Sequence, residues 1–240
     1  MITSKNTIIP YWCYTKTGLR HLADGEDNQD YIYVNSNDRI KFVAVADGVS
    51  SCENGRQGAE LACKVIFEAL KKEVDYLLSL NKKSIAYLIV NLVQSKVDKL
   101  ARKTGRDIFS FASTLSFVCV DCKTDRAISF SVGDSDIFAV TNDDQIKRMS
   151  EARKFEFGMC CATLTKEAYL YASVEIFDPF LIRLLFIGSD GAWNVMLKND
   201  VMDSNVVDCL MNNDYKALSD ILNDANNLDD CSFVCMNLAA

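Results

Sequence analysis

Two aspartates of this sequence have the clearest capacity for chemistry. Asp47 and Asp190 each stand directly before a glycine, and each follows an apolar run, residues 42–46 and residues 184–187. Such runs predict buried strands, so each strand would carry a carboxylate to the turn at its end. Carboxylates on rigid elements are the oxygen ligands that hard divalent cations such as Mg2+ prefer. The two aspartates therefore predict a metal site.

Further acidic turns repeat this plan. Asp134 lies between Gly133 and Ser135 after another apolar run, and Asp229 and Asp230 precede the last apolar run. A single Asp-Gly pair usually marks a turn and nothing more. Four acidic turns at strand ends favour a site, because glycine lets the backbone approach a ligand and its carbonyl is an oxygen donor. Motif order favours Asp229 over Asp230 as the ligand, and strand alternation would point the two side chains apart.

Composition limits the class of protein. The chain has 240 residues, 49% of them hydrophobic and 25% charged, which predicts a single domain over residues 1–240 with a sizeable core. The formal net charge is -7, which argues against partners gathered by long-range attraction, such as nucleic acid or an anionic membrane. It does not exclude a phosphorylated protein, because bound cations reverse the potential locally.

The cysteines favour a reducing compartment. The chain has ten of them, mostly within apolar stretches and not at spaced loop positions. Cys119 and Cys122 have a Cys-x-x-Cys spacing, but an alternating strand context makes them weak redox or zinc candidates. Residues 1–10 lack the apolar core of a signal peptide, and no window approaches a membrane span. We expect a cytoplasmic protein.

Hydrophobic periodicity predicts the elements that position these acids. Helices are expected over residues 59–78 and 85–100, the second capped by Ser84, and again over 201–211 and 215–226, the last capped by Asp214. Residues 18–30 are expected to form a polar loop, and 150–168 an irregular segment. Strands are expected at 8–17, 31–34, 42–46, 113–121, 126–132, 137–140, 145–149, 170–177, 183–188 and 231–238, the first three as an antiparallel meander. Strands and helices in blocks favour antiparallel sheets with helices outside.

An ordered set of motifs gives the chain a resemblance to a known family, the metal-dependent protein phosphatase 2C (PP2C) family of serine/threonine phosphatases. The motifs span residues 18–238 and are Asn28-Gln29-Asp30, the Asp47-Gly48 strand, Ser113-Thr114-Leu115, Gly133-Asp134-Ser135, Ser189-Asp190-Gly191 and Asp229-Asp230. The resemblance implies an α+β fold, an αββα sandwich of two antiparallel β-sheets flanked by helix pairs. It also implies a two-metal centre in a cleft at the sheet edge.

The resemblance assigns ligands to two Mg2+ or Mn2+ ions. Asp47 would bridge both ions, Asp190 and Asp229 would complete the first, and the Gly48 carbonyl would bind the second. Asp134 with Asp190 matches a third, weaker position. Two such cations lower the pKa of a bridging water and stabilise charge on a transferring phosphoryl group. Water would then attack in line without a phosphoenzyme.

The chain departs from the family pattern near the second ion. Gln29 stands where many members have a glutamate, so Asp30, Gly48 and waters would hold that ion. The loop from Gly18 to Asp30 is similar to a bacterial branch of the family that has a histidine at the position of His21. The stretch between Ser135 and Asp190 is short, which implies a reduced flap.

Two residues of that loop are candidates for contact with substrate. His21 is the sole histidine and has two open roles, a general acid toward the leaving alkoxide or a residue making structural hydrogen bonds. Arg20 is the best candidate to bind the substrate phosphate, because a guanidinium forks onto phosphate oxygens, and Arg56 is its competitor.

The hypothesis is therefore an active phosphatase for phosphoserine and phosphothreonine in proteins, with Arg20, His21 and Asp30 as catalytic residues. Such an enzyme implies a phosphorylated protein substrate and a cognate Ser/Thr kinase, and we expect a monomer. The alternative is a catalytically weak or silent member that binds phosphoproteins, which Gln29 keeps open. A phosphohydrolase of small molecules is a further rival, because it would share the metal site and differ in cleft shape.

Overall fold

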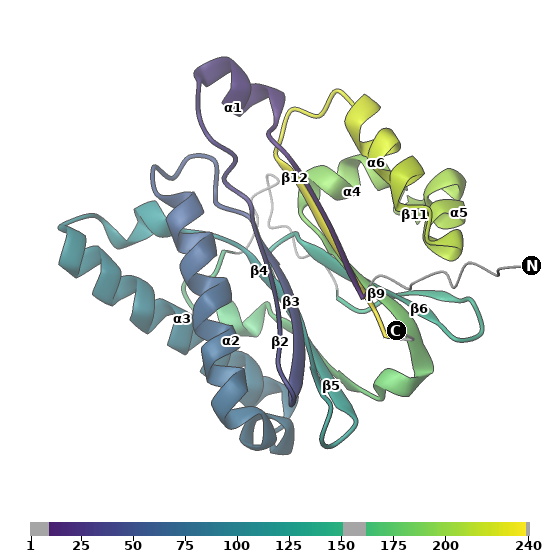
Figure 1. Ribbon diagram of the computed structural model, residues 1–240. Helices are drawn as coiled ribbons and strands as arrows, with labels where there is room; N and C mark the ends of the chain where they lie inside the picture. The colour runs from purple at the N-terminus through teal and green to yellow at the C-terminus, as the bar shows by residue number, and fades with distance from the viewer. Residues whose placement is uncertain (1–9, 151–161, 239–240) are drawn as a thin grey trace, which may run out of the picture.

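Two five-stranded antiparallel sheets form the centre of the protein, stacked face to face (Figure 1). The computed structural model describes residues 10–150 and 162–238. The first sheet has the order β1 (Tyr11–Lys16), β12 (Cys231–Asn237), β9 (Ile182–Gly188), β6 (Asp136–Thr141) and β7 (Ile146–Arg148). The second has the order β2 (Tyr31–Ser36), β3 (Ile40–Ala46), β4 (Leu115–Asp121), β5 (Arg126–Val132) and β8 (Ser173–Phe177).

Helices cover both outer faces of the sandwich. Figure 1 shows α2 (Gly55–Ser79) and α3 (Lys82–Thr104) against the second sheet. The first sheet is covered by α4 (Asp190–Met196), α5 (Ser204–Asn212) and α6 (Tyr215–Asp224), with the hairpin β10 (Leu197–Lys198) and β11 (Val201–Met202) beside them. Single turns of 3-10 helix occur at Ile108–Phe111, Ala168–Leu170 and Pro179–Leu181. The predicted αββα sandwich is confirmed, with three short helices on the first sheet.

The central strands are apolar without interruption because both of their faces are buried. In β3, Phe42 and Ala44 face the cluster under α2 and α3, while Val43 and Val45 face the layer between the sheets. All four side chains are fully buried. This double burial explains why the run before Asp47 shows no polar alternation, and it makes the strand a rigid support for that residue.

The two long helices were predicted, but the cap of α3 was assigned to the wrong residue. Asn81 is the N-cap, and its side chain accepts a hydrogen bond from the Ser84 backbone N–H at 2.9 Å. Ser84 therefore lies inside the first turn, three residues after the cap. The predicted cap of α6 is confirmed, since the Asp214 carboxylate accepts from the Ala217 N–H.

The predicted meander of the first three strands is wrong. β1 pairs with β12 in the first sheet, Tyr11 opposite Met236, whereas β2 and β3 pair in the second sheet. The polar segment between β1 and β2 contains α1 (Leu19–Asp24), which ends at Gly25 in the left-handed region, φ 70°. A helix of six residues is too short to produce a periodic pattern, so the segment was predicted as a loop.

Other differences lie near the C-terminal helices. The helix predicted over 201–211 begins only at Ser204, where the Asp203 side chain caps it, and Val201 and Met202 form β11. Helix α4 was not predicted. Residues 150–168 were predicted as irregular, and most of them, residues 151–161, lie outside the described residues.

The eight cysteines among the described residues are free, including Cys119 and Cys122. Within residues 10–150 and 162–238, no helix has the length and apolar character needed to cross a bilayer.

Candidate metal centre

Asp47 is fixed by the strand beside it. Its backbone N–H donates to Thr114 Oγ1 at 2.9 Å, and its carbonyl accepts from the Thr114 N–H at 2.8 Å. The next residue, Gly48, bridges to Ser113 and donates its N–H to the Gln29 carbonyl at 3.2 Å. The small polar residues before β4 thus hold the turn after β3 and fix the backbone of Asp47.

Asp134 lies in the tight turn between β5 and β6. Gly133 has φ 117°, a conformation that a residue with a side chain adopts only with strain. The hydroxyls of Ser116 and Ser131 both donate to the Ser135 carbonyl, at 2.6 and 2.8 Å. This buried hydroxyl network fixes the turn and therefore the position of Asp134.

Asp190 is the first residue of α4. Behind it, Gly191 packs so closely on the start of β12 that an added Cβ would lie 2.0 Å from the Asp230 carbonyl oxygen. The Asn227 side chain donates to the Gly191 carbonyl at 2.6 Å. Only glycine permits this approach, which ties the first turn of α4 to the segment that carries Asp229.

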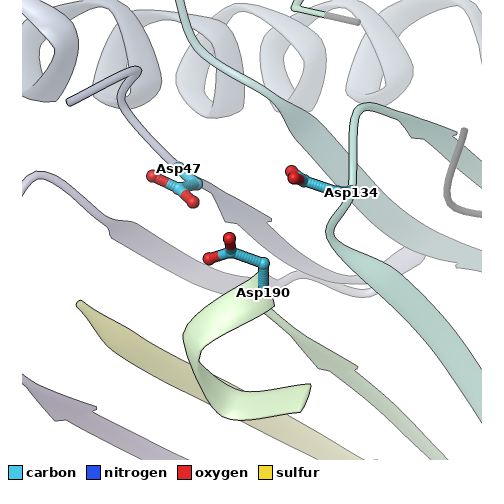
Figure 2. Close-up of side chains that lie close together, drawn as sticks. All are labelled: Asp47, Asp134 and Asp190. Carbon is cyan, nitrogen blue, oxygen red and sulfur yellow. The ribbon is translucent and has the colours of Figure 1, made fainter. Parts of the chain in front are cut away.

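These three turns bring three carboxylates together, one after β3, one between β5 and β6 and one at the start of α4. Asp47, Asp134 and Asp190 each offer an oxygen, and the three oxygens lie within 4.8 Å of one another. Figure 2 shows the three side chains pointing toward a common space. The structure thus brings three of the predicted acids together.

Asp30 lies behind this cluster and is 1% exposed. Its Oδ2 accepts from the Ser189 hydroxyl at 2.8 Å. Desolvation raises the pKa of Asp30 to about 7 and outweighs the Ser189 hydrogen bond, which lowers it, while the charge of Asp230 adds a smaller upward contribution. Desolvation also raises the pKa of Asp47, and the charges of Asp30, Asp190 and Asp134 raise it further.

The donor atoms fit a hard divalent cation. Asp30 Oδ1 and Gln29 Oε1 are buried without a hydrogen-bond partner among the described residues. Unpaired buried oxygens and mutually repelling carboxylates destabilise a fold unless something supplies positive charge. Carboxylate, amide and carbonyl oxygens are the ligands that Mg2+ and Mn2+ select.

Asp229 and Asp230 have different surroundings. The Asp230 carboxylate is buried and accepts from the Gly18 N–H at 2.7 Å and the Gln29 N–H at 2.6 Å, and it also contacts His21. The Asp229 side chain is 34% exposed and pairs with Arg20 at 3.2 Å. Asp230 is therefore fully engaged in holding the fold, whereas Asp229 lies outside the three-carboxylate cluster with an oxygen accessible to solvent.

The residues predicted to contact substrate also differ in exposure and in contacts. Arg20 is 62% exposed, whereas Arg56 donates to the Asp30 and Asn28 carbonyls and stacks over the Tyr31 ring. The Arg56 guanidinium thus already binds backbone carbonyl oxygens, which makes Arg20 the better candidate to bind phosphate. His21 is buried, and its contacts to Asp230 and Glu26 correspond to the structural role among its two open roles.

The family model described as protein phosphatase 2C matches residues 17–224. The chain belongs to this family. Comparison with curated protein sequences gives no match.

Solved PP2C structures share the fold at low identity. The serine/threonine phosphatase Stp1 from Staphylococcus aureus is 14% identical with a TM-score of 0.62, over 96% of this chain and 95% of that chain. The catalytic domain of the phosphatase PstP, solved with two manganese ions, is 13% identical with a TM-score of 0.65, over 95% and 96%. RsbX, solved with magnesium, is 10% identical with a TM-score of 0.61, over 95% and 94%.

The sequence analysis missed two residues that shape this PP2C site. Asn227 carried no motif, and only its bond to Gly191 reveals its role. Arg148, which pairs with Asp136 two residues after Asp134, was also missed. Asp136 itself was the available signal, because a buried carboxylate requires a cationic partner.

Proposed function

We propose that this PP2C chain is a Mg2+- or Mn2+-dependent phosphatase that hydrolyses phosphoserine and phosphothreonine in proteins. The observation that carries the proposal is the convergence of Asp47, Asp134 and Asp190 within 4.8 Å, with the buried Asp30 behind them. The magnesium of RsbX and the two manganese ions of PstP, on the same fold, support a divalent metal here as well.

The chain's own residues divide the work of such a site. Asp47 and Asp190 would hold two cations, Asp134 would support a third position, and the Gly48 carbonyl would add a neutral oxygen. Asp229 would become a further metal ligand once its ion pair with Arg20 breaks, because that ion pair is exposed and therefore weak. When bound, the cations would lower the pKa of a water and stabilise charge on the phosphoryl group. Asp30 would orient that water from behind.

Arg20 is the proposed phosphate ligand. Its guanidinium is exposed beside Asp229 and can fork onto two phosphate oxygens. His21 would act as a positioning residue through Asp230. A serine nucleophile is disfavoured, because the Ser189 hydroxyl is buried, donates to Asp30 and accepts from the Ser232 N–H. Water is then the nucleophile.

A second candidate function is a catalytically weak or silent module that binds phosphoproteins. The neutral Gln29 favours it, because one charged ligand fewer weakens a cation site. Both candidates imply a phosphorylated protein partner and a cognate Ser/Thr kinase. We further propose that residues 1–240 act as one domain, as a monomer, in the cytoplasm.

Hydrolysis of a phosphothreonine peptide with Mn2+, Mg2+ or EDTA tests the proposal, with Asp190→Asn as the variant. Asp200→Asn is a matched control, because Asp200 is exposed on the rim of the same hollow. We expect metal-dependent turnover that falls by on the order of a hundredfold or more in Asp190→Asn. The Asp200→Asn protein should keep the turnover of the parent. A folded parent that turns over nothing with any metal would support the silent module.

A further inference from the structure

A basic groove runs along the open edge of the sandwich, where the two sheets end in β7 and β8. Its volume is about 960 Å3, and its lining includes Lys82, Lys83, Lys147, Arg148, Tyr169 and Glu175. β7 and β8 are the last strands of their sheets in the part of the chain that the structure describes. Among the described residues no strand pairs with their outer edges, and an extended segment can bind such edges through main-chain hydrogen bonds.

The charge of the groove contrasts with that of the protein. Four cationic side chains and one acid line it, although the chain carries a formal net charge of -7. Lys82 is paired with Glu175 at 2.7 Å, and Arg148 with Asp136. Lys83 and Lys147 are exposed and have no ion pair within residues 10–150 and 162–238. The groove thus retains positive charge available to an anionic ligand.

The groove and the hollow beside the metal centre share one lining residue, Arg148. A smaller hollow of about 230 Å3 is lined by Asp134 and Asp190 of the carboxylate cluster, and by Trp193. Arg148 lines this hollow and the basic groove. A chain whose phosphorylated residue lay at the carboxylates could therefore continue past Arg148 into the groove.

The far end of the groove offers contacts for side chains. Tyr169 and Lys83 also line a neighbouring hollow of about 450 Å3 with the exposed rings of Tyr76 and Tyr87. Tyrosine supplies large contact area with few rotatable bonds, and it is enriched in binding surfaces. The surface is thus suited to a polypeptide and not only to a small anion.

We propose that this groove binds an extended acidic segment next to the phosphorylated residue of the substrate protein, so that the enzyme prefers phosphosites flanked by Asp and Glu. The inference rests on the proposed phosphatase function and adds a class of substrate to it. Lys83 and Lys147 supply the charge that selects the segment, and the edges of β7 and β8 hold its backbone.

The test compares two phosphothreonine peptides that differ only in their flank, one with glutamates and one with glutamines at the same positions. The variant is Lys83→Glu/Lys147→Glu. Lys83 lies in the first turn of α3, where an acidic residue is favourable for the helix, so the variant should fold. The control is Lys72→Glu/Lys96→Glu, the same charge change on exposed lysines of a separate hollow of about 390 Å3.

We expect the parent to have a lower KM for the glutamate peptide than for the glutamine peptide. In the variant, the ratio of the two KM values should fall by about tenfold, since each surface charge contributes modestly to binding. The kcat for both peptides and the hydrolysis of p-nitrophenyl phosphate should stay unchanged, because neither lysine touches the carboxylates. The preference should also weaken as salt is added. A parent without preference, or a control with the same loss as the variant, would overturn the proposal.

A second readout separates this inference from the phosphatase function. Fluorescence anisotropy of the labelled glutamate peptide measures binding without turnover. Binding by the parent that is lost in the variant and kept in the control supports the groove, even in a protein that hydrolyses nothing. Absence of binding by the parent contradicts the groove, even where p-nitrophenyl phosphate is hydrolysed.

Discussion

The imidazole Nδ1 of His21 lies 2.9 Å from Oδ2 of Asp230. The same carboxylate accepts the backbone N–H groups of Gly18 and Gln29, so it ties both ends of the segment that contains α1 to the start of β12. Arg20 lies within this closed segment. The position of the proposed phosphate ligand therefore depends on a buried carboxylate that lies outside the cluster of three acids.

This arrangement predicts that His21 acts by position. His21→Asn keeps a side-chain donor near Asp230 and should retain most of kcat, whereas His21→Ala removes a hydrogen bond to a buried carboxylate. The loss should lower the free energy of unfolding by roughly 1.5 to 3 kcal/mol. It should also raise KM through Arg20. Urea denaturation and steady-state kinetics on both variants measure these effects.

A general acid gives another pattern. Both substitutions would then lower kcat by a factor on the order of a hundred or more, and most for substrates with a poor leaving group. A stable His21→Asn protein with such a loss in kcat, restored with p-nitrophenyl phosphate, would show that the imidazole transfers a proton.

Asp229 and Asp230 should respond differently to the same substitution. Asp229→Asn breaks only an exposed pair with Arg20, so the unfolding free energy should change by about 1 kcal/mol or less, while the affinity for Mn2+ falls. In Asp230→Asn, the amide NH2 group would face a backbone N–H donor in a buried site, where the carboxylate oxygen accepts a hydrogen bond. The substitution should lower the free energy of unfolding by roughly 3 kcal/mol. Calorimetric titration with Mn2+ and urea denaturation test the pair together. Weaker Mn2+ binding in Asp230→Asn alone, at unchanged stability, would reverse the assignment.

The local part of this fold was predictable from sequence, and the non-local part was not. The runs that form β3 and β9 are apolar because both faces are buried, and that signal lies within each run. The pairing of β1 with β12 joins the two ends of the described chain, and no local pattern encodes it. The same limit applies to the site. Asp47, Asp134 and Asp190 were identified from their turns, but the engagement of Asp230 with Gly18 depends on that long-range pairing.

Gln29→Glu should increase the affinity for the second cation. Gln29 Oε1 is buried without a hydrogen-bond partner among the described residues, and a carboxylate there adds one charged ligand. Calorimetric titration should give a Mn2+ dissociation constant lower by about tenfold, and the metal-free variant should be less stable because another acid joins Asp30 and Asp47. The neighbouring change Asn28→Asp controls for added charge alone. Equal affinity in the parent and Gln29→Glu would place this side chain outside the metal site.

The buried acid Asp30 should make the metal-free protein lose stability as the pH rises. Desolvation raises its pKa to about 7 in the folded protein, against about 3.9 in an unfolded chain. Between these two pKa values the folded state binds one more proton than the unfolded state. The contribution of Asp30 to the free energy of unfolding is therefore complete below about pH 4 and is lost as the pH rises through about 7.

Asp30→Asn keeps an acceptor for the Ser189 hydroxyl but cannot ionise. Urea denaturation in EDTA between about pH 4 and pH 8 should show the unfolding free energy of the parent falling relative to that of this variant by roughly 4 kcal/mol. Added Mn2+ should reverse the fall at the upper end, because the cation neutralises the ionised carboxylates. Parallel stability curves for the two proteins would mean that Asp30 is ionised throughout and that the cluster is less desolvated than its geometry implies.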